Sequence, residues 1–159
     1  MRISELLHET TIKVGLDAKN KTTAIEELID LLVEEHEISL ADRGTVINTV
    51  LQREEMMSTG MEHGIAIPHG AVECVNDVVA ALGISKGIDF ESMDGEPAQI
   101  IVLLILPKDK YTAGVRTMAG ITKLLTHDTL REKITNATDS MDVMAGIIEE
   151  EERQFLERN

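Results

Sequence analysis

His69 is the residue in this sequence best suited to chemistry, because it stands between a proline and a glycine at the end of the apolar run 65–68. Pro68 fixes its own φ and restricts the residue before it, which gives the imidazole a stiff backbone mount. Gly70 allows another backbone to approach closely. A neutral imidazole is a nucleophile near neutral pH. We therefore expect a nucleophile at the edge of a sheet where ligands collect; the alternative is a turn histidine bonded within its own loop.

The residues upstream of His69 indicate what such a nucleophile would attack. Arg53 supplies a permanent cation at the end of a predicted helix. Ser58, Thr59 and Gly60 supply hydroxyl and amide donors in a predicted loop. Beside a guanidinium and several donors, the electrophile that fits is an anionic phosphoryl group. This arrangement predicts phosphoryl chemistry on histidine.

A metal site is a weaker alternative. His63 and His69 flank a short predicted strand, a spacing that matches metal ligation poorly. His8, His36 and His127 are most simply surface histidines. The single cysteine, Cys74, excludes an internal disulfide and a cysteine-based zinc cluster. We expect no metal and no organic cofactor.

The charge balance excludes several classes of partner. The 159 residues contain 29 Asp and Glu against 15 Lys and Arg, which leaves a net charge of −14. Nucleic-acid binding and basic membrane-surface helices both need clustered cations, so neither is expected. The longest apolar run, 100–106, is far too short to span a membrane, and residues 1–8 lack a signal-peptide pattern. These features predict a cytoplasmic protein.

The hydrophobic pattern predicts strands and helices in one continuous domain over 1–159, with its core over about 3–148. Short apolar runs predict strands at 12–14, 65–68, 78–84 and 100–106. Apolar residues at helical spacing predict helices over 25–32, 46–51, 115–125, 130–134 and 143–148, the first with a capping box at Thr23 and Glu26. We expect a single α/β domain with a mixed parallel and antiparallel sheet and helices on both faces.

Five segments together resemble a known family. They are Lys21–Ile25, Arg53–Gly60, Gly64–Gly70, Gly87–Pro97 and Leu124–Ile134. The most specific is the Ile-Ala-Ile-Pro-His run of 65–69 with the upstream Arg53. Along nearly the whole chain, the sequence resembles the enzyme IIA domains of the phosphotransferase system, in the fructose/mannitol and nitrogen-regulatory branch.

The resemblance implies a phosphohistidine carrier, and so a phosphotransferase component. Such domains accept a phosphoryl group from the histidine-containing phosphocarrier protein and relay it to a IIB partner for sugar uptake, or use it as a regulatory signal. On this interpretation His69 is phosphorylated and Arg53 stabilises the phosphoryl charge. Ser58, Thr59, Gly60, Pro68 and Gly70 surround the phosphoryl group, and no cofactor is implied.

Two positions depart from the family pattern. Gly114 stands where the family usually carries a second histidine, and Glu62 stands where it tends to carry glycine. One change removes a donor and the other adds a negative charge near a phosphoryl dianion. His63 could serve as an auxiliary donor. These departures motivate an alternative: a regulatory binding module that keeps the fold and is phosphorylated weakly or not at all.

Overall fold

A mixed five-stranded sheet forms the centre of the computed structural model, which describes residues 2–158. The strands are β1 (Ile12–Val14), β2 (Ile65–Ala66), β3 (His69–Val72), β4 (Val79–Ile88) and β5 (Ala98–Pro107). The strand order is β1–β4–β5–β2, and β3 also pairs with β5. β4 and β5 are antiparallel, while β1, β2 and β3 each run parallel to their neighbour. The expected mixed sheet is confirmed.

β2 and β3 form one edge strand that is interrupted at Ile67 and Pro68. Ile65 pairs with Ile100 and His69 pairs with Leu104, so both strands keep the same register against β5. Proline has no N–H to donate to the ladder. The chain nevertheless stays against β5, because the amide of Leu104 donates to the Pro68 carbonyl at 3.0 Å. The sequence places the end of the strand at Pro68, whereas pairing resumes at the next residue.

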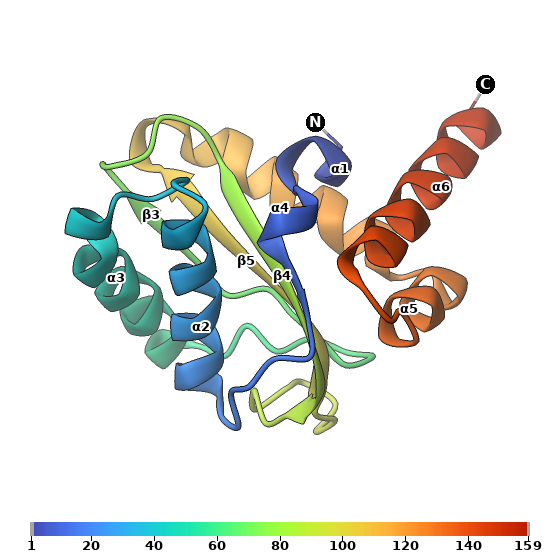
Figure 1. Cartoon of the computed structure of the whole chain (residues 1–159), viewed down its shortest axis with the longest axis horizontal. Coiled ribbons are helices and arrows are strands. Elements are labelled where there is room, and N and C mark those ends of the chain that lie inside the picture. Colours follow the sequence, from blue (N-terminus) through green and yellow to red (C-terminus); the bar gives the residue numbers. More distant parts are fainter. Residues whose placement is uncertain (1, 159) are drawn as a thin grey trace.

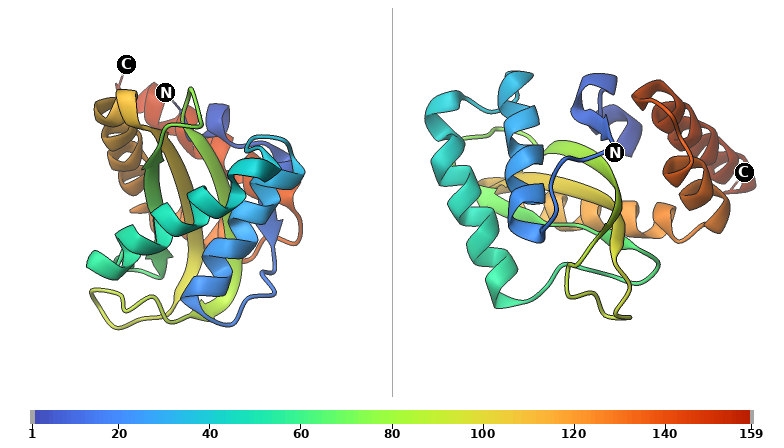
Figure 2. Two further views of the ribbon diagram at one scale, coloured as in Figure 1. Left: turned by 90° about the vertical axis from the view of Figure 1, so that its left-hand side faces the viewer. Right: turned by 60° about the horizontal axis from the view of Figure 1, so that its bottom comes forward.

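Helices cover both faces of the sheet, as Figures 1 and 2 show. The α-helices are α1 (Ile3–Leu6), α2 (Lys21–Glu34), α3 (Arg43–Met56), α4 (Tyr111–Leu125), α5 (Asp128–Thr135) and α6 (Ser140–Arg158). Short 3-10 helices are η1 (Glu9–Thr11), η2 (Leu40–Asp42) and η3 (Lys108–Lys110). α2 and α3 pack with one face of β4 and β5 in one buried cluster, and α1, α4, α5 and α6 pack with the other face in a second. Helices on both faces were expected.

α2 begins earlier than its apolar pattern predicts. The side chain of Asn20 accepts a hydrogen bond from the Thr23 amide at 2.9 Å, so Asn20 is the N-cap. Asparagine and threonine are both good caps, and the sequence pattern alone favoured Thr23. The buried stripe of α2 is the expected one and includes Ile25, Leu28 and Leu32.

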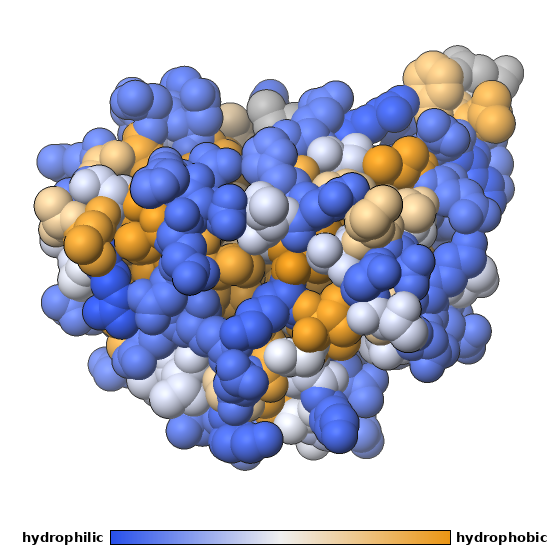
Figure 3. Space-filling model, viewed as in Figure 1, coloured by the Kyte–Doolittle hydropathy of each residue, from blue (hydrophilic) through white to orange (hydrophobic). Residues whose placement is uncertain are grey.

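The surface is largely hydrophilic over α2, as Figure 3 shows, in keeping with the acidic composition. Within residues 2–158, no helix has both the length and the apolar character that crossing a membrane requires.

Candidate active site

His69 is the first residue of β3, so the sheet itself positions its side chain. Its pairing partner Leu104 belongs to the buried cluster on the α4 side of the sheet. The next residue, Gly70, faces α3: a Cβ built there would lie 3.0 Å from Val50. Side chains alternate along a strand, so His69 leaves the strand on the α4 side. The position differs from the sequence expectation, in which His69 follows the strand.

A backbone hydrogen bond fixes the orientation of the His69 ring. Nδ1 lies 3.0 Å from the carbonyl oxygen of Ile67. A carbonyl can only accept, so Nδ1 carries a hydrogen in this bond and Nε2 carries the lone pair of the neutral ring. Because Ile67 precedes Pro68 in the interruption of the edge strand, its carbonyl is turned to the ring two residues on.

The surroundings favour the neutral form of His69. Burial lowers the pKa of His69 below its ordinary value. The Ile67 hydrogen bond opposes this effect, the positive charge of Arg53 adds to it, and the negative charge of Glu54 opposes it. The net result is a lowered pKa, so the half-buried ring is neutral and nucleophilic at Nε2 at neutral pH.

Arg53 lies in the last turn of α3 and is close enough to His69 for its charge to affect the histidine's pKa. Its Nη1 donates to the Met57 carbonyl oxygen at 2.7 Å. A guanidinium has five N–H donors, and this bond uses one of them. The helix end thus carries a cation whose charge acts on His69.

Residues 58–60 run alongside the edge strand, opposite Ala66 and Ile67. The amide of Ile67 donates to the Thr59 carbonyl at 3.2 Å, and Gly60 forms a bridge with Ala66. The hydroxyl of Ser58 donates to the Phe90 carbonyl and accepts from the Gly60 amide. The Thr59 hydroxyl donates to Glu54. Both hydroxyls therefore bond to protein groups and shape this segment.

Two glycines permit close packing around this segment. A Cβ on Gly60 would lie 2.5 Å from the Ser92 hydroxyl oxygen and 2.9 Å from its Cα, which leaves no room for a side chain. A Cβ on Gly70 would press on Thr49 and Val50 of α3. Gly70 therefore lets α3 lie directly against the backbone of β3.

His63 and Glu62 lie in a loop whose contacts lead away from His69. The backbone amide of His63 donates to Asp94 at 3.0 Å, and its Nε2 lies 3.8 Å from Glu62. Both side chains are more than half exposed, so solvent screens the Glu62 charge. Over residues 2–158, no three histidine, cysteine or acidic side chains are grouped to hold a metal ion.

Gly114, where the resemblance places a second histidine, packs directly against a buried side chain. Gly114 is buried in α4, and a Cβ built on it would lie 2.8 Å from Cδ1 of Leu106 and 2.9 Å from Cδ2. Leu106 is itself fully buried. A histidine at position 114 would need Leu106 to move, so α4 and β5 of this chain are adapted to glycine.

Glu54, which is 4% exposed, is a residue of this region that the sequence motifs do not single out. Its carboxylate accepts from the amide and the hydroxyl of Thr59. A signal was available: the buried face of α3 is Val46, Ile47, Val50 and Glu54, so a carboxylate occupies an apolar position of the helical pattern.

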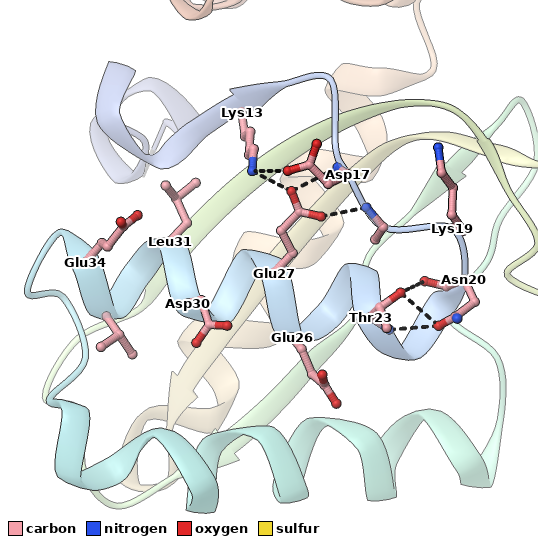
Figure 4. A pocket seen from close by; sticks show the side chains of 12 residues that line it. Lys13, Asp17, Lys19, Asn20, Thr23, Glu26, Glu27, Asp30, Leu31 and Glu34 are labelled. Atoms are coloured by element: carbon pink, nitrogen blue, oxygen red, sulfur yellow. Dashed lines mark hydrogen bonds and ion pairs between the residues drawn. The ribbon is translucent and has the colours of Figure 1, made fainter.

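A hollow of about 810 Å³ beside α2, drawn in Figure 4, is bordered by the hydrogen-bonded and ion-paired Glu27. Glu27 accepts from the amides of Asp17 and Ala18 and lies 2.6 Å from the Lys13 ammonium. Burial raises the pKa of Glu27, but Lys13 and the two amides outweigh burial and leave it lowered. Glu27 thereby holds residues 13–18 on α2.

Sequence comparison identifies relatives over nearly all of this chain. The family described as "Phosphoenolpyruvate-dependent sugar phosphotransferase system, EIIA 2" matches residues 5–151. A fructose-specific EIIA component from Haloferax volcanii is 32% identical over 133 residues, covering 81% of this chain and 85% of that protein. A nitrogen regulatory protein from Bradyrhizobium diazoefficiens is 28% identical, covering 90% of this chain and 92% of that protein. A fructose-specific EIIABC component from Bacillus subtilis is 31% identical over 96% of this chain, which spans only 24% of that protein.

Solved structures share the fold. The nitrogen regulatory protein IIA-Ntr from Neisseria meningitidis has a TM-score of 0.81 and 25% identity, covering 91% of this chain and 98% of that one. Enzyme IIAMTL, in its complex with phosphorylated enzyme IIBMTL from Escherichia coli, has a TM-score of 0.75 and 19% identity, covering 89% of this chain and 96% of that chain.

Proposed function

The chain belongs to the EIIA 2 family of the phosphoenolpyruvate-dependent sugar phosphotransferase system, and we propose that it carries a phosphoryl group on Nε2 of His69. The observation that carries this proposal is the hydrogen bond from Nδ1 to the Ile67 carbonyl, which leaves Nε2 as the nucleophilic nitrogen. The lowered pKa of His69 supports it, because a neutral ring can attack without first losing a proton.

In the proposed transfer, the Nε2 lone pair attacks the phosphorus of a phosphohistidine on the donor. A new N–P bond forms at Nε2, and the N–P bond to the donor breaks with its electron pair returning to the donor imidazole. Nδ1 keeps the proton that it donates to Ile67. Relay to the next protein reverses these roles, and it is feasible because a phosphoramidate is a high-energy linkage.

Arg53 offsets the charge of the phosphoryl group during both transfers, using N–H donors beyond the one given to Met57. Ser58, Thr59 and Gly60 act through the shape of the segment they form, since both hydroxyls and the amides of Thr59 and Gly60 bond to protein groups. Pro68 and Gly70 act through the backbone: one stiffens the mount of His69 and the other lets α3 approach β3.

We propose the histidine-containing phosphocarrier protein as the donor and a IIB domain or a regulatory target as the recipient. The relatives support both kinds of recipient, since some are named as fructose-specific components and others as nitrogen regulatory proteins. The related mannitol-specific IIA was solved in complex with its phosphorylated IIB. Such an exchange between carrier proteins would take place in the cytoplasm.

One observation favours a second function. Gly114 stands where the family usually carries a second histidine, and Leu106 packs directly against it. The second function that we propose is regulation of a target by docking, with the fold retained and phosphotransfer lost.

The test is phosphoryl transfer from phosphoenolpyruvate through enzyme I and the phosphocarrier protein to this protein. The product is detected by measuring the intact mass of this protein. We expect the wild type to gain one phosphoryl group and His69→Ala to gain none. The control is His127→Ala, which changes a histidine at the start of α5. It should gain one phosphoryl group, as the wild type does. A wild type that stays unlabelled with competent donors would support the docking function instead.

A further inference from the structure

Glu54 is a buried carboxylate to which the proposed transfer assigns no role. The Thr59 amide donates to both of its oxygens, at 3.2 and 3.0 Å, and the Thr59 hydroxyl donates to Oε1 at 3.0 Å. The ammonium of Lys21, from the start of α2, lies 3.6 Å from the same oxygen. Burying a carboxylate is costly unless it is paired and hydrogen-bonded. All of these contacts lead to Thr59 or to α2, and none is with the neighbouring Arg53.

A continuous series of hydrogen bonds connects Glu54 to the nucleophile. Glu54 holds the amide of Thr59, and the carbonyl of Thr59 accepts from the Ile67 amide at 3.2 Å. The carbonyl of Ile67 then accepts from Nδ1 of His69 at 3.0 Å. Ile67 is therefore fixed at its N–H by the 58–60 segment and at its C=O by the histidine ring.

Polar bonds hold the 57–59 segment in place, among them the bond from the Ser58 hydroxyl to the Phe90 carbonyl. A hollow of about 580 Å³ opens beside it, lined by residues that include Lys21, Glu54, Ser58 and Glu91. Met57 is 67% exposed. At one end of the segment, Arg53 donates a hydrogen bond to the Met57 carbonyl. At the other end, Glu54 accepts a hydrogen bond from the Thr59 amide. Polar bonds from two consecutive residues of α3 thus add to the bond between Ser58 and Phe90 in holding this segment.

We propose that Glu54 is a positioning residue for phosphoryl transfer at His69: it fixes Thr59, and through Thr59 and Ile67 it holds the ring with Nδ1 protonated and Nε2 outward. The part that concerns transfer rests on the proposed function. The part that concerns ring orientation does not, because it applies to the unphosphorylated protein.

The first test compares Glu54→Gln with Glu55→Gln in ¹⁵N-labelled protein. The two changes remove the same charge from neighbouring positions of α3, and Glu55 is exposed. Ring ¹⁵N shifts report the tautomer and the pKa of His69 directly. In Glu54→Gln we expect a mixture of the two tautomers and a pKa below that of the wild type, because a negative charge that opposes the lowering is gone. Glu55→Gln should match the wild type.

The transfer assay gives the second readout. We expect Glu54→Gln to accept the phosphoryl group about tenfold more slowly at saturating donor, since a ring held loosely attacks less often in the productive orientation. Glu55→Gln should accept the phosphoryl group at the wild-type rate. Thr59→Ser keeps both donors to the carboxylate and is the reference for Thr59→Val. Thr59→Val, which loses only the hydroxyl, should accept the phosphoryl group at a rate between those of Glu54→Gln and the wild type.

A Glu54→Gln protein that is less stable but keeps the wild-type tautomer and pKa of His69 would overturn the proposal and reduce Glu54 to a structural role. If Glu54→Gln does not fold, the Thr59 pair decides: identical ring spectra in Thr59→Val and Thr59→Ser would overturn it. Failure of the proposed function looks different, since the wild type would then take up no phosphoryl group. The ring spectra would still decide whether Glu54 orients His69.

Discussion

Two regions of this molecule each place an arginine beside a buried glutamate, and they use the pair in opposite ways. In α6, Arg153 donates from Nε to Glu150 at 3.0 Å and from Nη2 to its other oxygen, so the two side chains neutralise one another. In α3, Arg53 donates to the Met57 carbonyl, while Glu54 accepts from Thr59.

The difference separates a pair of charges bonded to one another from a pair bonded to different groups. Glu150 is 7% exposed and packs where α6 meets His127 at the start of α5, with Gln154 of its own helix as a further donor. The guanidinium of Arg153 balances the negative charge of Glu150. Arg53 and Glu54 instead point at different groups, which leaves a guanidinium with donors for an anion and a carboxylate that fixes a loop.

Exchanging each arginine for glutamine tests this division and should give the largest effect. Arg53→Gln should slow phosphoryl acceptance about 100-fold, because one charged donor to the transferring group is lost, with little change in Tm. Arg153→Gln should leave the rate unchanged and lower Tm, because Glu150 loses its main partner. The measurements are a mass-resolved time course and thermal unfolding. Equal losses of rate in the two variants would contradict the division.

The second largest difference between the two regions should appear in how the acceptance rate and the stability depend on pH. The pKa of His69 lies below its ordinary value of 6.5, mainly because of burial. The acceptance rate should therefore be flat above pH 6.5 and fall about tenfold per unit only below the lowered pKa. The stability that the neutral ring contributes follows the same sign: it is complete above 6.5 and is lost as pH falls from there through the lowered value.

Glu150 should affect the stability of the fold in a lower pH range than His69 does. The hydrogen bond from Arg153 holds its pKa below the ordinary 4.5, against the effect of burial. Its contribution to stability is complete above 4.5 and is lost as pH falls through the lowered value. Glu150→Gln should remove this acid-range loss and leave the rate profile of His69 unchanged. Chemical denaturation across pH, with rates measured in parallel, checks both statements. A displaced rate profile in Glu150→Gln would show that the regions are coupled.

The smallest effect is expected in α4. Gly114→Ala should lower stability by about 1 kcal/mol, because overpacking against the buried Leu106 exceeds the gain in helix propensity. Gly120→Ala is the matched control: it is exposed, and nothing lies within 4 Å of its Cβ position, so it should raise stability by about 0.5 to 1 kcal/mol. Urea unfolding measures both. If Gly114→Ala proves as stable as Gly120→Ala, Leu106 repacks freely and the site is not adapted to glycine.

Local sequence pattern predicted the structure well wherever neighbouring residues determine it. The mixed sheet, the buried stripe of α2 and the placement of Arg53 at a helix end all follow from apolar spacing. The prediction was incomplete where partners are distant in the fold. Pairing with β5 carries the edge strand past Pro68, and nothing local to residues 65–72 encodes that. The use of Glu54 depends on where Thr59 returns to α3, which only the tertiary structure determines.

The interrupted edge strand also protects the molecule against association through its sheet. An unbroken edge offers a row of unpaired N–H and C=O groups to a strand of another chain. Here β2 is two residues long, Pro68 has no N–H, and residues 59–61 already pair with Ile65 and Ile67. The opposite edge, β1, is only three residues long. The chain can therefore carry His69 on an edge strand whose interruption makes that edge a poor template for aggregation.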